Sequence, residues 1–577
     1  MDDTKIKAEL PGVIPAPRQT RRRWPILLAC LALVGCLHLL RLVSPTSRLP
    51  CDKTTHQPAV CPQSDTLVPE KNSALWTELT QLQATDDFLG RAVAQLSAAV
   101  QIPTETFDSM GPVGEDPRWV TRGPFVDHLV AAFPLVHAAM DLQKVNTYGL
   151  VYTWQGSDAS LKPLLLMGHY DVVPVAPLSV DEWTHPAYSG HFDGEFIWGR
   201  GCADDKSGVI GILTTIELLL ENDFKPTRTI VLSFGFDEEA GGFHGAGHLG
   251  PALLERFGPD SFAMIVDEGA GFVETYGAIF ATPGVAEKGY TDISVEVQSP
   301  GGHSSIPPEH TSIGILAALI VQLEANPPPA HLVPGTTLFE MAQCLAAHAP
   351  DLPVDLKRVL LRAGHSEKAR KEAERMLFSS DPAFRALAGT TQAVDVISGG
   401  VKSNALPEQA VAIVNHRIAT QSSVNETLKR NTDLLRDLAI ERFNLSVIAH
   451  GEQLTPASAA SAGTLILSTP RTLEPAPITP SDAPPFKLLA GTIRAAIRAS
   501  SDKIAGDSPV YVAPGMMSGN TDTRYTWALS RHIFRYGHGS GGMGGIHTVN
   551  EHIRATDFVG MITFFTTLIL NVDEAVL

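Results

Sequence analysis

The sequence has few cysteines and few basic residues, and both shortages exclude classes of protein. Six cysteines in 577 residues are too few and too scattered for a disulfide-held scaffold. Lys and Arg number 44 against 62 Asp and Glu, a formal net charge of −18. Nucleic acid is therefore excluded as a partner, because phosphate binding needs a basic face. The remaining composition, 44% apolar, is typical of a globular protein with two or three domains.

Long hydrophobic runs are also rare, and the clearest lies near the N-terminus. Residues 24–43 carry Arg41 as their single full charge, and 20 residues at about 1.5 Å each match a bilayer core of about 30 Å. Basic residues cluster before this run, which places a cytosolic tail, residues 1–23, on the inner side. We predict an uncleaved transmembrane signal anchor, hence a single-pass type II membrane protein with a lumenal body. A cleaved signal peptide is the alternative.

The chain that follows this anchor has features of a lumenal protein. Residues 44–70 are rich in Pro and Thr and are predicted to form a stalk. Asn425 and Asn444 begin acceptor sequences for N-glycosylation. In an oxidising compartment Cys51 and Cys61 could form a disulfide.

Beyond residue 70, apolar runs suited to buried strands alternate with helical patterns. LLLMGH, TIVLSFG and FAMIVD are such runs, and residues 205–221 have the apolar spacing of a helix. The alternation predicts an α/β catalytic domain with a mostly parallel sheet, formed by residues 71–287 and 453–577. From residue 288 the strands instead alternate apolar and polar residues. We therefore predict an inserted α+β lid or dimerisation domain over residues 288–452.

Acidic and imidazole side chains follow the buried strands where those strands end. A polar strand end that meets water is the ordinary explanation for each pair taken singly. Because the carboxyl ends of parallel strands form the ligand-binding edge of an open α/β sheet, we expect the pairs to meet at one site. These residues are His169, Asp171, Glu238, Glu239, Asp267 and Glu268, joined by Asp204 after a further strand and by His547 in a glycine-rich loop.

The residue types at these positions indicate a metal centre. Imidazole and carboxylate without thiolate suit zinc or a similar divalent ion. A carboxylate that bridges two metal ions offers one oxygen to each of them. Glu238 and Glu239 are adjacent, and neighbours on a strand point in opposite directions. One of them can therefore bind metal while the other acts as a general base.

Six motifs occur in this order: GHYDVVPV, GRGCADDKSG, FDEEAGG, VDEG, SPGGHSS and IHTVNEHI. Together they resemble the co-catalytic zinc metallopeptidase and aminoacylase family, from residue 75 to the C-terminus. Within that family the chain is most similar to fungal vacuolar carboxypeptidase S (Gly-X carboxypeptidase) and to animal N-acyl-amino-acid hydrolases. The resemblance implies two zinc ions per subunit, one held by His169, Asp204 and Asp267, the other by Asp204, Glu239 and His547.

The same resemblance implies the catalytic roles. Glu238 is the general base that takes a proton from a water bridging the two metal ions. Asp171 orients the ligand His169. A cis peptide bond is expected between Asp204 and Asp205.

Four further residues are implied in substrate binding. His303 would polarise the scissile carbonyl, often from a neighbouring subunit, which implies a homodimer through the inserted domain; an ordinary exposed loop histidine is the alternative. Asn404 and Arg417 would hold the substrate. Arg524 would bind a free carboxylate with two parallel hydrogen bonds, unless it pairs with Asp522.

The predicted activity is that of a zinc-dependent metallocarboxypeptidase of the Gly-X type, in the vacuole. An N-acyl-amino-acid amidohydrolase is the first alternative, because its substrates also end in a free carboxylate. A non-catalytic membrane receptor on a peptidase fold is the second, and such a protein should lack a ligand or the base. The expected partners are a substrate with a free carboxylate and the membrane.

Overall fold

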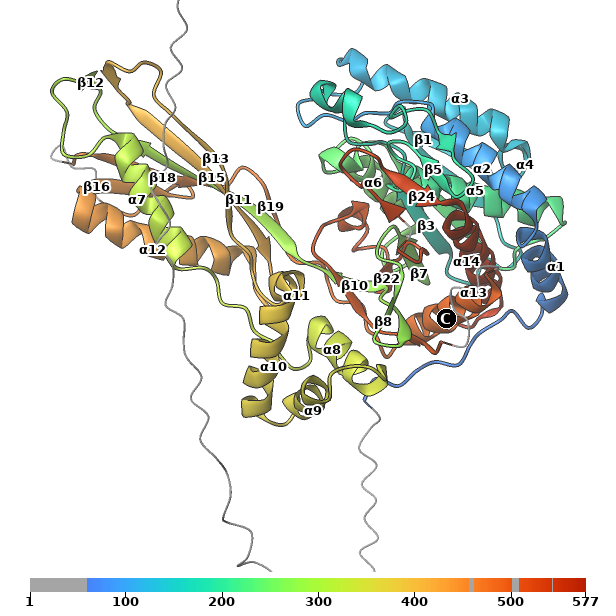
Figure 1. The fold of residues 1–577 in the computed structure, drawn as a ribbon. Helices are drawn as coiled ribbons and strands as arrows, with labels where there is room; N and C mark the ends of the chain where they lie inside the picture. The colour runs from blue at the N-terminus through green and yellow to red at the C-terminus, as the bar shows by residue number, and fades with distance from the viewer. Residues whose placement is uncertain (1–59, 456–460, 501–507, 542) are drawn as a thin grey trace, which may run out of the picture. The chain divides into compact units, whose positions relative to one another are not determined.

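The computed structural model describes residues 60–455, 461–500, 508–541 and 543–577 (Figure 1). The predicted anchor, Cys51 and most of the predicted stalk lie outside these residues. Among the described helices one, α14 (Ala555–Glu574), is long and apolar enough to cross a membrane, but 94% of its apolar window is buried inside the protein. It packs against α5 (Lys206–Glu221) and α13 (Pro484–Ala499), so it is a core helix.

The catalytic part contains an eight-stranded sheet whose centre is parallel. The neighbouring pairs β6–β3, β3–β7 and β7–β22 are all parallel, whereas β1, β2 and β10 bring antiparallel pairs at the sides. Strands β3, β6 and β7 are buried along their whole length, which explains their unbroken apolar sequences. The strand order is β1 (Asp141–Val145), β2 (Gly149–Trp154), β6 (Ile230–Gly235), β3 (Leu164–His169), β7 (Met264–Asp267), β22 (Ile533–Arg535), β10 (Gly284–Glu287) and β21 (Gly515–Met517).

Helices cover both faces of this sheet. Apolar residues of α5, α13, α14 and α2 (Asp86–Val100) form one large core, and α6 (Ala246–Phe257) covers a second, smaller core. Two separate helices precede the sheet, because α1 (Ser73–Gln83) ends before α2 begins. Thr85 separates them because its side chain accepts a hydrogen bond from the backbone of Phe88 and caps α2. Two further helices are α3 (Arg122–Ala132) and α4 (Pro134–Ala139).

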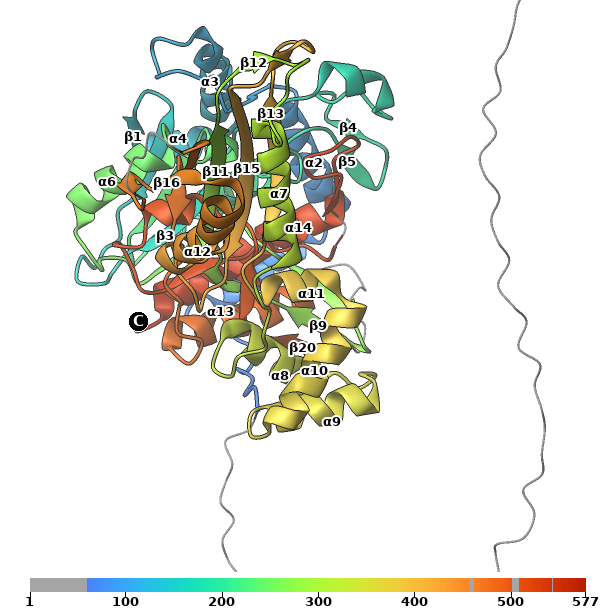
Figure 2. The ribbon, with the colours of Figure 1, turned by 90° about the vertical axis from the view of Figure 1, so that its left-hand side faces the viewer.

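A second sheet begins where the inserted domain was predicted. Strand β10 ends at Glu287 and β11 starts at Gly289, so the chain passes from the first sheet to the second at Lys288. Helices α7 (Ser312–Ala325) and α12 (Val424–Phe443) lie side by side on this sheet (Figure 2). The strands are β13 (Ala393–Gly399), β15 (Gln409–Ile418), β11 (Gly289–Gln298), β18 (Gly463–Ser468), β16 (Leu445–Ala449) and β17 (Glu452–Gln453), with β19 (Thr472–Leu473) beside β11.

The inserted part differs from its prediction in two respects. Strands β18 and β19 follow the predicted boundary at residue 452 yet pair with β11, and we propose that the insert extends to residue 473. The other helices of the insert do not pack into the core under α7 and α12. They form a separate hydrophobic core together with β9 (Ala278–Ala281) of the catalytic part. These helices are α8 (Thr337–His348), α9 (Val354–Ala363), α10 (Glu367–Ser380) and α11 (Pro382–Leu387).

The chain just after residue 60 is fastened to the body, although the sequence predicted a stalk up to residue 70. Cys61 forms a disulfide with Cys344 of α8, so the bridge between Cys51 and Cys61 that the sequence left open is not formed. The side-chain amide of Gln63 donates to the carbonyl of Val512 at 3.1 Å and accepts from its N–H at 2.9 Å. Val512 ends β20 (Val510–Val512), which pairs with β9 and through it with β8 (Phe272–Thr275). The side-chain amide of Gln63 thus forms hydrogen bonds with both the N–H and the carbonyl of Val512.

Candidate active site

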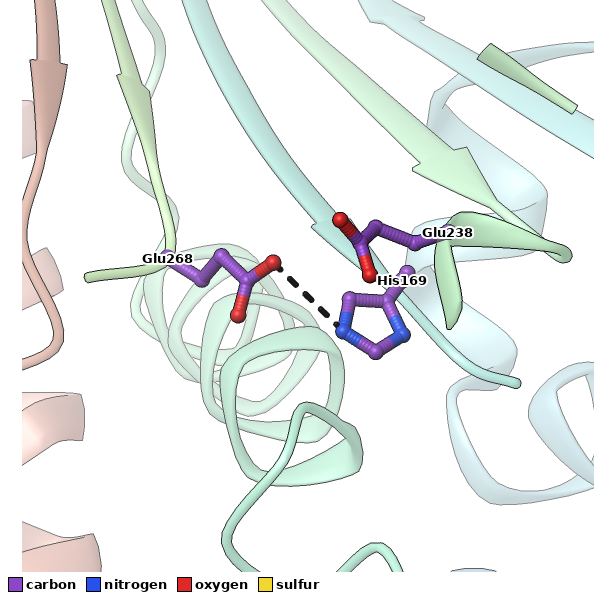
Figure 3. A group of neighbouring side chains, drawn as sticks. All are labelled: His169, Glu238 and Glu268. Carbon is purple, nitrogen blue, oxygen red and sulfur yellow. Dashed lines mark ion pairs between the residues drawn. The ribbon is translucent and has the colours of Figure 1, made fainter. Parts of the chain in front are cut away.

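Two sheet strands and the turn after a third deliver side chains to one place. His169 is the last residue of β3, and Glu268 follows β7 directly. Strand β6 ends at Gly235, so Glu238 lies in the short 3-10 turn Glu238–Ala240 and not on the strand itself. Ligand atoms of His169, Glu238 and Glu268 lie within 4.8 Å of one another (Figure 3). His169 Nε2 is 3.5 Å from Glu268 Oε1.

A second group of ligand atoms lies beside the first. Asp204, Glu239 and His547 place one atom each within 4.8 Å of the others. His547 Nε2 is 3.0 Å from Glu239 Oε2 and 3.1 Å from Asp204 Oδ2. The other oxygen of Asp204, Oδ1, is 3.1 Å from His169 Nε2. Asp204 therefore presents one oxygen to each histidine, which is the arrangement that a bridging ligand between two metal ions requires.

The charges at the site fit cations. Carboxylates outnumber imidazoles here, and no Lys or Arg forms an ion pair with Asp204, Glu238, Glu239 or Glu268 in the part of the chain that the structure describes. Such a cluster is costly to bury unless positive charge is bound. Imidazole and carboxylate donors without thiolate suit zinc and similar divalent ions.

The neighbouring carboxylates raise the pKa values of both histidines. Burial alone lowers the pKa of His169, but the carboxylates of Glu268, Asp171 and Asp204 raise that pKa well above its ordinary value. Hydrogen bonds to Asp204 and Glu239 raise the pKa of His547 to about 10. A bound divalent cation would take the place of these protons.

The third predicted ligand of the first metal, Asp267, does not join either group. Asp267 is buried, its Oδ2 has no hydrogen-bond partner among the described residues, and burial followed by the charge of Glu268 raises its pKa to about 7. Glu268 instead lies against His169. Neighbouring residues at a strand end point in opposite directions, so one of the pair faces His169 and the other does not. Asp267 stays a prediction, and the geometry favours Glu268.

Asp171 is buried and supports two parts of the site. Its Oδ1 lies 3.3 Å from His169 Nδ1, the contact expected of a residue that orients this ligand. The same carboxylate accepts hydrogen bonds from the backbone N–H groups of Glu238 at 3.0 Å and Glu239 at 3.2 Å. One side chain therefore holds both a histidine and the glutamate turn.

The peptide bond between Asp204 and Asp205 is cis, as the family resemblance implied. Asp205 then caps α5, because its side chain accepts a hydrogen bond from the N–H of Gly208 at 3.2 Å. Asp204 is thus fixed at the start of a buried helix.

Two predicted substrate residues of the insert, His303 and Asn404, form no hydrogen bond or ion pair with these ligands among the described residues. His303 lies in β12 (Gly302–His303), which pairs with β14 (Ala405–Leu406), and Asn404 precedes β14. Both residues are exposed. Within the described chain, the side-chain hydrogen bonds of His303 go to Ser305 of its own loop. Both residues therefore lie together at the surface of the insert.

Arg417 and Arg524 lie close to the junction of the two sheets. Arg417 Nη1 donates to Asn520 at 3.3 Å, and Asn520 in turn donates to the backbone carbonyl of Lys288 at 2.6 Å. Arg524 is half-buried, and its Nε has no partner among the described residues. The alternative pairing of Arg524 with Asp522 is not formed, because Asp522 is buried with both oxygens unpartnered in that part of the chain.

The sequence did not indicate the position of Asp522, which packs against the glutamate turn. A Cβ atom on Gly235 would lie 2.2 Å from one Asp522 oxygen, and one on Gly242 would lie 2.3 Å from the other. Gly242 also has a positive φ of 70°, a conformation that favours glycine. The glycines on either side of Glu238 and Glu239 therefore make room for this carboxyl group. The signal that could have indicated it is the same GNTDTR segment that directed attention to Arg524.

The comparison with known families follows from this geometry. Residues 165–571 match the model of Peptidase family M20/M25/M40. The chain belongs to this metallopeptidase family, and the predicted resemblance is confirmed.

Two relatives and one solved structure illustrate this membership. Carboxypeptidase S of Saccharomyces cerevisiae is 41% identical over 501 residues, covering 84% of this chain and 85% of the relative. The N-fatty-acyl-amino acid synthase/hydrolase PM20D1 of Mus musculus is 32% identical over 489 residues, covering 83% and 87%. The crystal structure of human carnosine dipeptidase 1 shares the fold, with a TM-score of 0.58 and 17% identity over 88% of this chain and 100% of that one.

Proposed function

We propose that this protein is a two-zinc carboxypeptidase that removes the C-terminal residue from peptides. The observation that carries the proposal is Asp204, whose two oxygens lie 3.1 Å from His169 and 3.1 Å from His547. A carboxypeptidase S with 41% identity supports the substrate class. His169, Asp204, Glu239 and His547 would hold the ions, with Asp267 or Glu268 as the fifth ligand.

Zinc, when bound, would polarise the substrate carbonyl and lower the pKa of water. The carboxylate of Glu238 would act as the general base that accepts a proton from the attacking water and as the general acid that returns it to the leaving amine. Burial, followed by the charge of Glu268, raises the pKa of Glu238 well above its ordinary value. Asp171 fixes the backbone of Glu238 and keeps the carboxylate in reach of the metal ligands.

The substrate carboxylate would be bound by Arg524 and Arg417. Arg524 has a donor without a partner in the described chain, and a planar guanidinium can bind a carboxylate through two parallel hydrogen bonds. Asn404 and His303 would contact the scissile amide. A site that requires a free carboxylate next to the cleaved bond is that of an exopeptidase.

His303 is exposed, and in the described chain its side-chain hydrogen bonds stay within its own loop. We therefore propose that it contacts the substrate bound at the active site of a second subunit. The insert has exposed apolar residues suited to such a homodimer: Ile313 and Val321 on α7, and Val396 and Ile397 on β13. Strand β13 is the edge of its sheet and pairs with β15 alone within the described residues. An exposed apolar edge of this kind is a typical pairing surface.

Hydrolysis of N-acyl amino acids is the second candidate, and one feature of the site favours it. Phe243 and Ile546 are 49% and 46% exposed. Phe243 follows the last residue of the glutamate turn by three positions, and Ile546 directly precedes His547. These apolar side chains could contact an acyl chain, which agrees with the 32% identity to PM20D1.

The two candidates can be separated with purified protein. Benzyloxycarbonyl-Gly-Leu, the same peptide with a C-terminal amide, and a long-chain acyl amino acid would be assayed side by side with added zinc. We expect cleavage of the first, none of the second, and slower cleavage of the third. Preference for the acyl amino acid would reverse the order of the two candidates, and equal cleavage of the amide would refute the carboxylate requirement.

We also propose that the body is lumenal, in the vacuole, behind the predicted anchor. The disulfide of Cys61 and Cys344 suits an oxidising compartment. Asn425 and Asn444 are exposed near the two ends of α12, so both can accept glycans. Glycosidase treatment should increase the electrophoretic mobility of the protein, and Asn425→Gln with Asn444→Gln should remove that shift. A mobility that glycosidase does not change would contradict the lumenal assignment.

A further inference from the structure

Glu551 joins the two loops that carry Asp204 and His547. Its side chain is 1% exposed, and it lies four residues after His547. Oxygen Oε1 accepts hydrogen bonds from the backbone N–H groups of Gly201 at 3.0 Å, Ala203 at 3.0 Å and Asp204 at 3.2 Å. One carboxylate oxygen therefore fixes the backbone up to and including Asp204.

Arg200 makes the reciprocal contacts from the other loop. Its Nη1 donates to Glu551 Oε2 at 2.6 Å, and its Nη2 donates to the backbone carbonyl of Thr548 at 3.0 Å. The N–H of Gly199 donates to the carbonyl of Glu551 at 2.9 Å. Contacts thus run in both directions between residues 199–204 and 548–551.

The loop with Asp204 and the loop with His547 both adjoin strands of one small sheet, and the pairing of these strands fixes the position of one loop relative to the other. Strand β5 leads into residues 199–204, and the loop with His547 lies between β23 and β24. Strand β24 pairs with β5 on one side and with β23 on the other. The order is β23 (Met543–Gly544), β24 (His552–Arg554), β5 (Phe196–Trp198) and β4 (His191–Phe192).

The loop with His547 also needs support from outside. His547 has a φ of 59° and Asn550 a φ of 62°, left-handed conformations that residues other than glycine seldom adopt. Such conformations persist where the surrounding structure holds them. Glu551 and Arg200 supply that support directly after the strained residues.

We infer that Glu551 is a positioning residue that sets the affinity of the metal ion held by Asp204, Glu239 and His547. It acts by holding the Asp204 loop at a fixed distance from the His547 loop, with Arg200 as its partner. The inference rests on the proposed two-metal function. It predicts that loosening this contact weakens the binding of both ions, because Asp204 lies against both histidines. The ion on His547 should be weakened more, because His169 and Glu268 come from the large sheet.

The test compares Glu551→Gln with a matched control, Glu574→Gln, in the full chain. Glu574 also accepts three backbone N–H groups, those of Glu70, Lys71 and Asn72, but it fastens the N-terminal segment. Zinc content would be measured against a graded chelator, together with thermal unfolding with and without zinc. We expect Glu551→Gln to bind the ion on His547 about 10–100-fold more weakly, a loss typical of residues that support metal ligands, and to bind the other ion with a smaller loss. Glu574→Gln should lower the unfolding temperature and leave both zinc affinities unchanged.

Three results separate the alternatives. Wild-type zinc affinities in a folded Glu551→Gln protein would overturn the inference and leave the proposed function intact. A wild-type protein that binds no zinc would refute the proposed function itself. Should Glu551→Gln fail to fold, Arg200→Lys would replace it, because a lysine lacks the planar fork whose two nitrogens reach Glu551 and Thr548 separately. Unchanged zinc affinity in that variant would overturn the inference as well.

Discussion

The structure brings the proposed metal-binding residues together, but within the described chain it does not show His303, the residue proposed to activate the substrate, bonded to them. In the catalytic part, His169, Asp204, Glu239 and His547 already lie within hydrogen-bonding distance of their neighbours in the cluster. On the insert, His303 is exposed and bonds within its own loop. Under the proposed function, metal binding depends on the catalytic part alone, whereas substrate activation depends on how the insert meets a site. The predictions below test this division.

The largest effect is expected on the catalytic side. Glu238→Gln removes the base and keeps the size of the side chain, so kcat should fall by about 10²–10⁴-fold while both zinc ions remain bound. Activity assays and metal analysis on the same sample would check this. Near-normal turnover with full zinc content would remove Glu238 from the mechanism.

His303→Ala tests the insert side. Loss of a group that polarises the scissile carbonyl should lower kcat by about 10²–10³-fold without changing zinc content. The same variant can be used to determine which subunit provides the histidine. Mixing His303→Ala with Glu238→Gln subunits should restore activity, because a mixed dimer contains one site with both groups. No recovery after proven subunit exchange would show that His303 acts within its own chain.

Glu268→Gln and Asp267→Asn form a matched pair at the end of β7. If Glu268 is the ligand, its substitution should weaken zinc binding by at least about 10–100-fold, and Asp267→Asn should have the smaller effect. Chelator competition would measure both. The reverse ranking would favour the ligand that the family resemblance implied.

The smallest effect on activity is expected far from both the metal-binding residues and His303. Cys344→Ser opens the bond to Cys61 and should lower the free energy of unfolding by about 2–4 kcal/mol, because the bond closes a loop with a sequence separation of 283 residues. Turnover at 25 °C should stay unchanged. Denaturant titration would supply the stability, and a change in kcat instead would link α8 to the site.

Local patterns were enough to locate the buried strands and most of the residues that meet at the candidate site. The apolar runs before His169 and Asp267 have the continuous burial of parallel strands, and polar residues at their ends must face the same edge. The alternation in β11 likewise follows from one buried face. These features depend on neighbours in sequence, which is why the pattern contains them.

Contacts between remote residues could not be predicted in the same way. The partner of Cys61 is 283 residues away, and spacing alone does not fix disulfide connectivity. The choice between Asp267 and Glu268 depends on which way one strand end faces. Asp171 reaches the turn of Glu238 only because β3 and β6 are neighbours. Glu551 had no local signal beyond its place in the motif with His547.

The most direct test is anomalous diffraction at the zinc edge from crystals of the zinc-loaded protein. The account predicts two peaks about 3.5–4 Å apart, with one oxygen of Asp204 on each and His169 and His547 on opposite sides. A single peak, or a pair in which Asp204 touches only one ion, would contradict it.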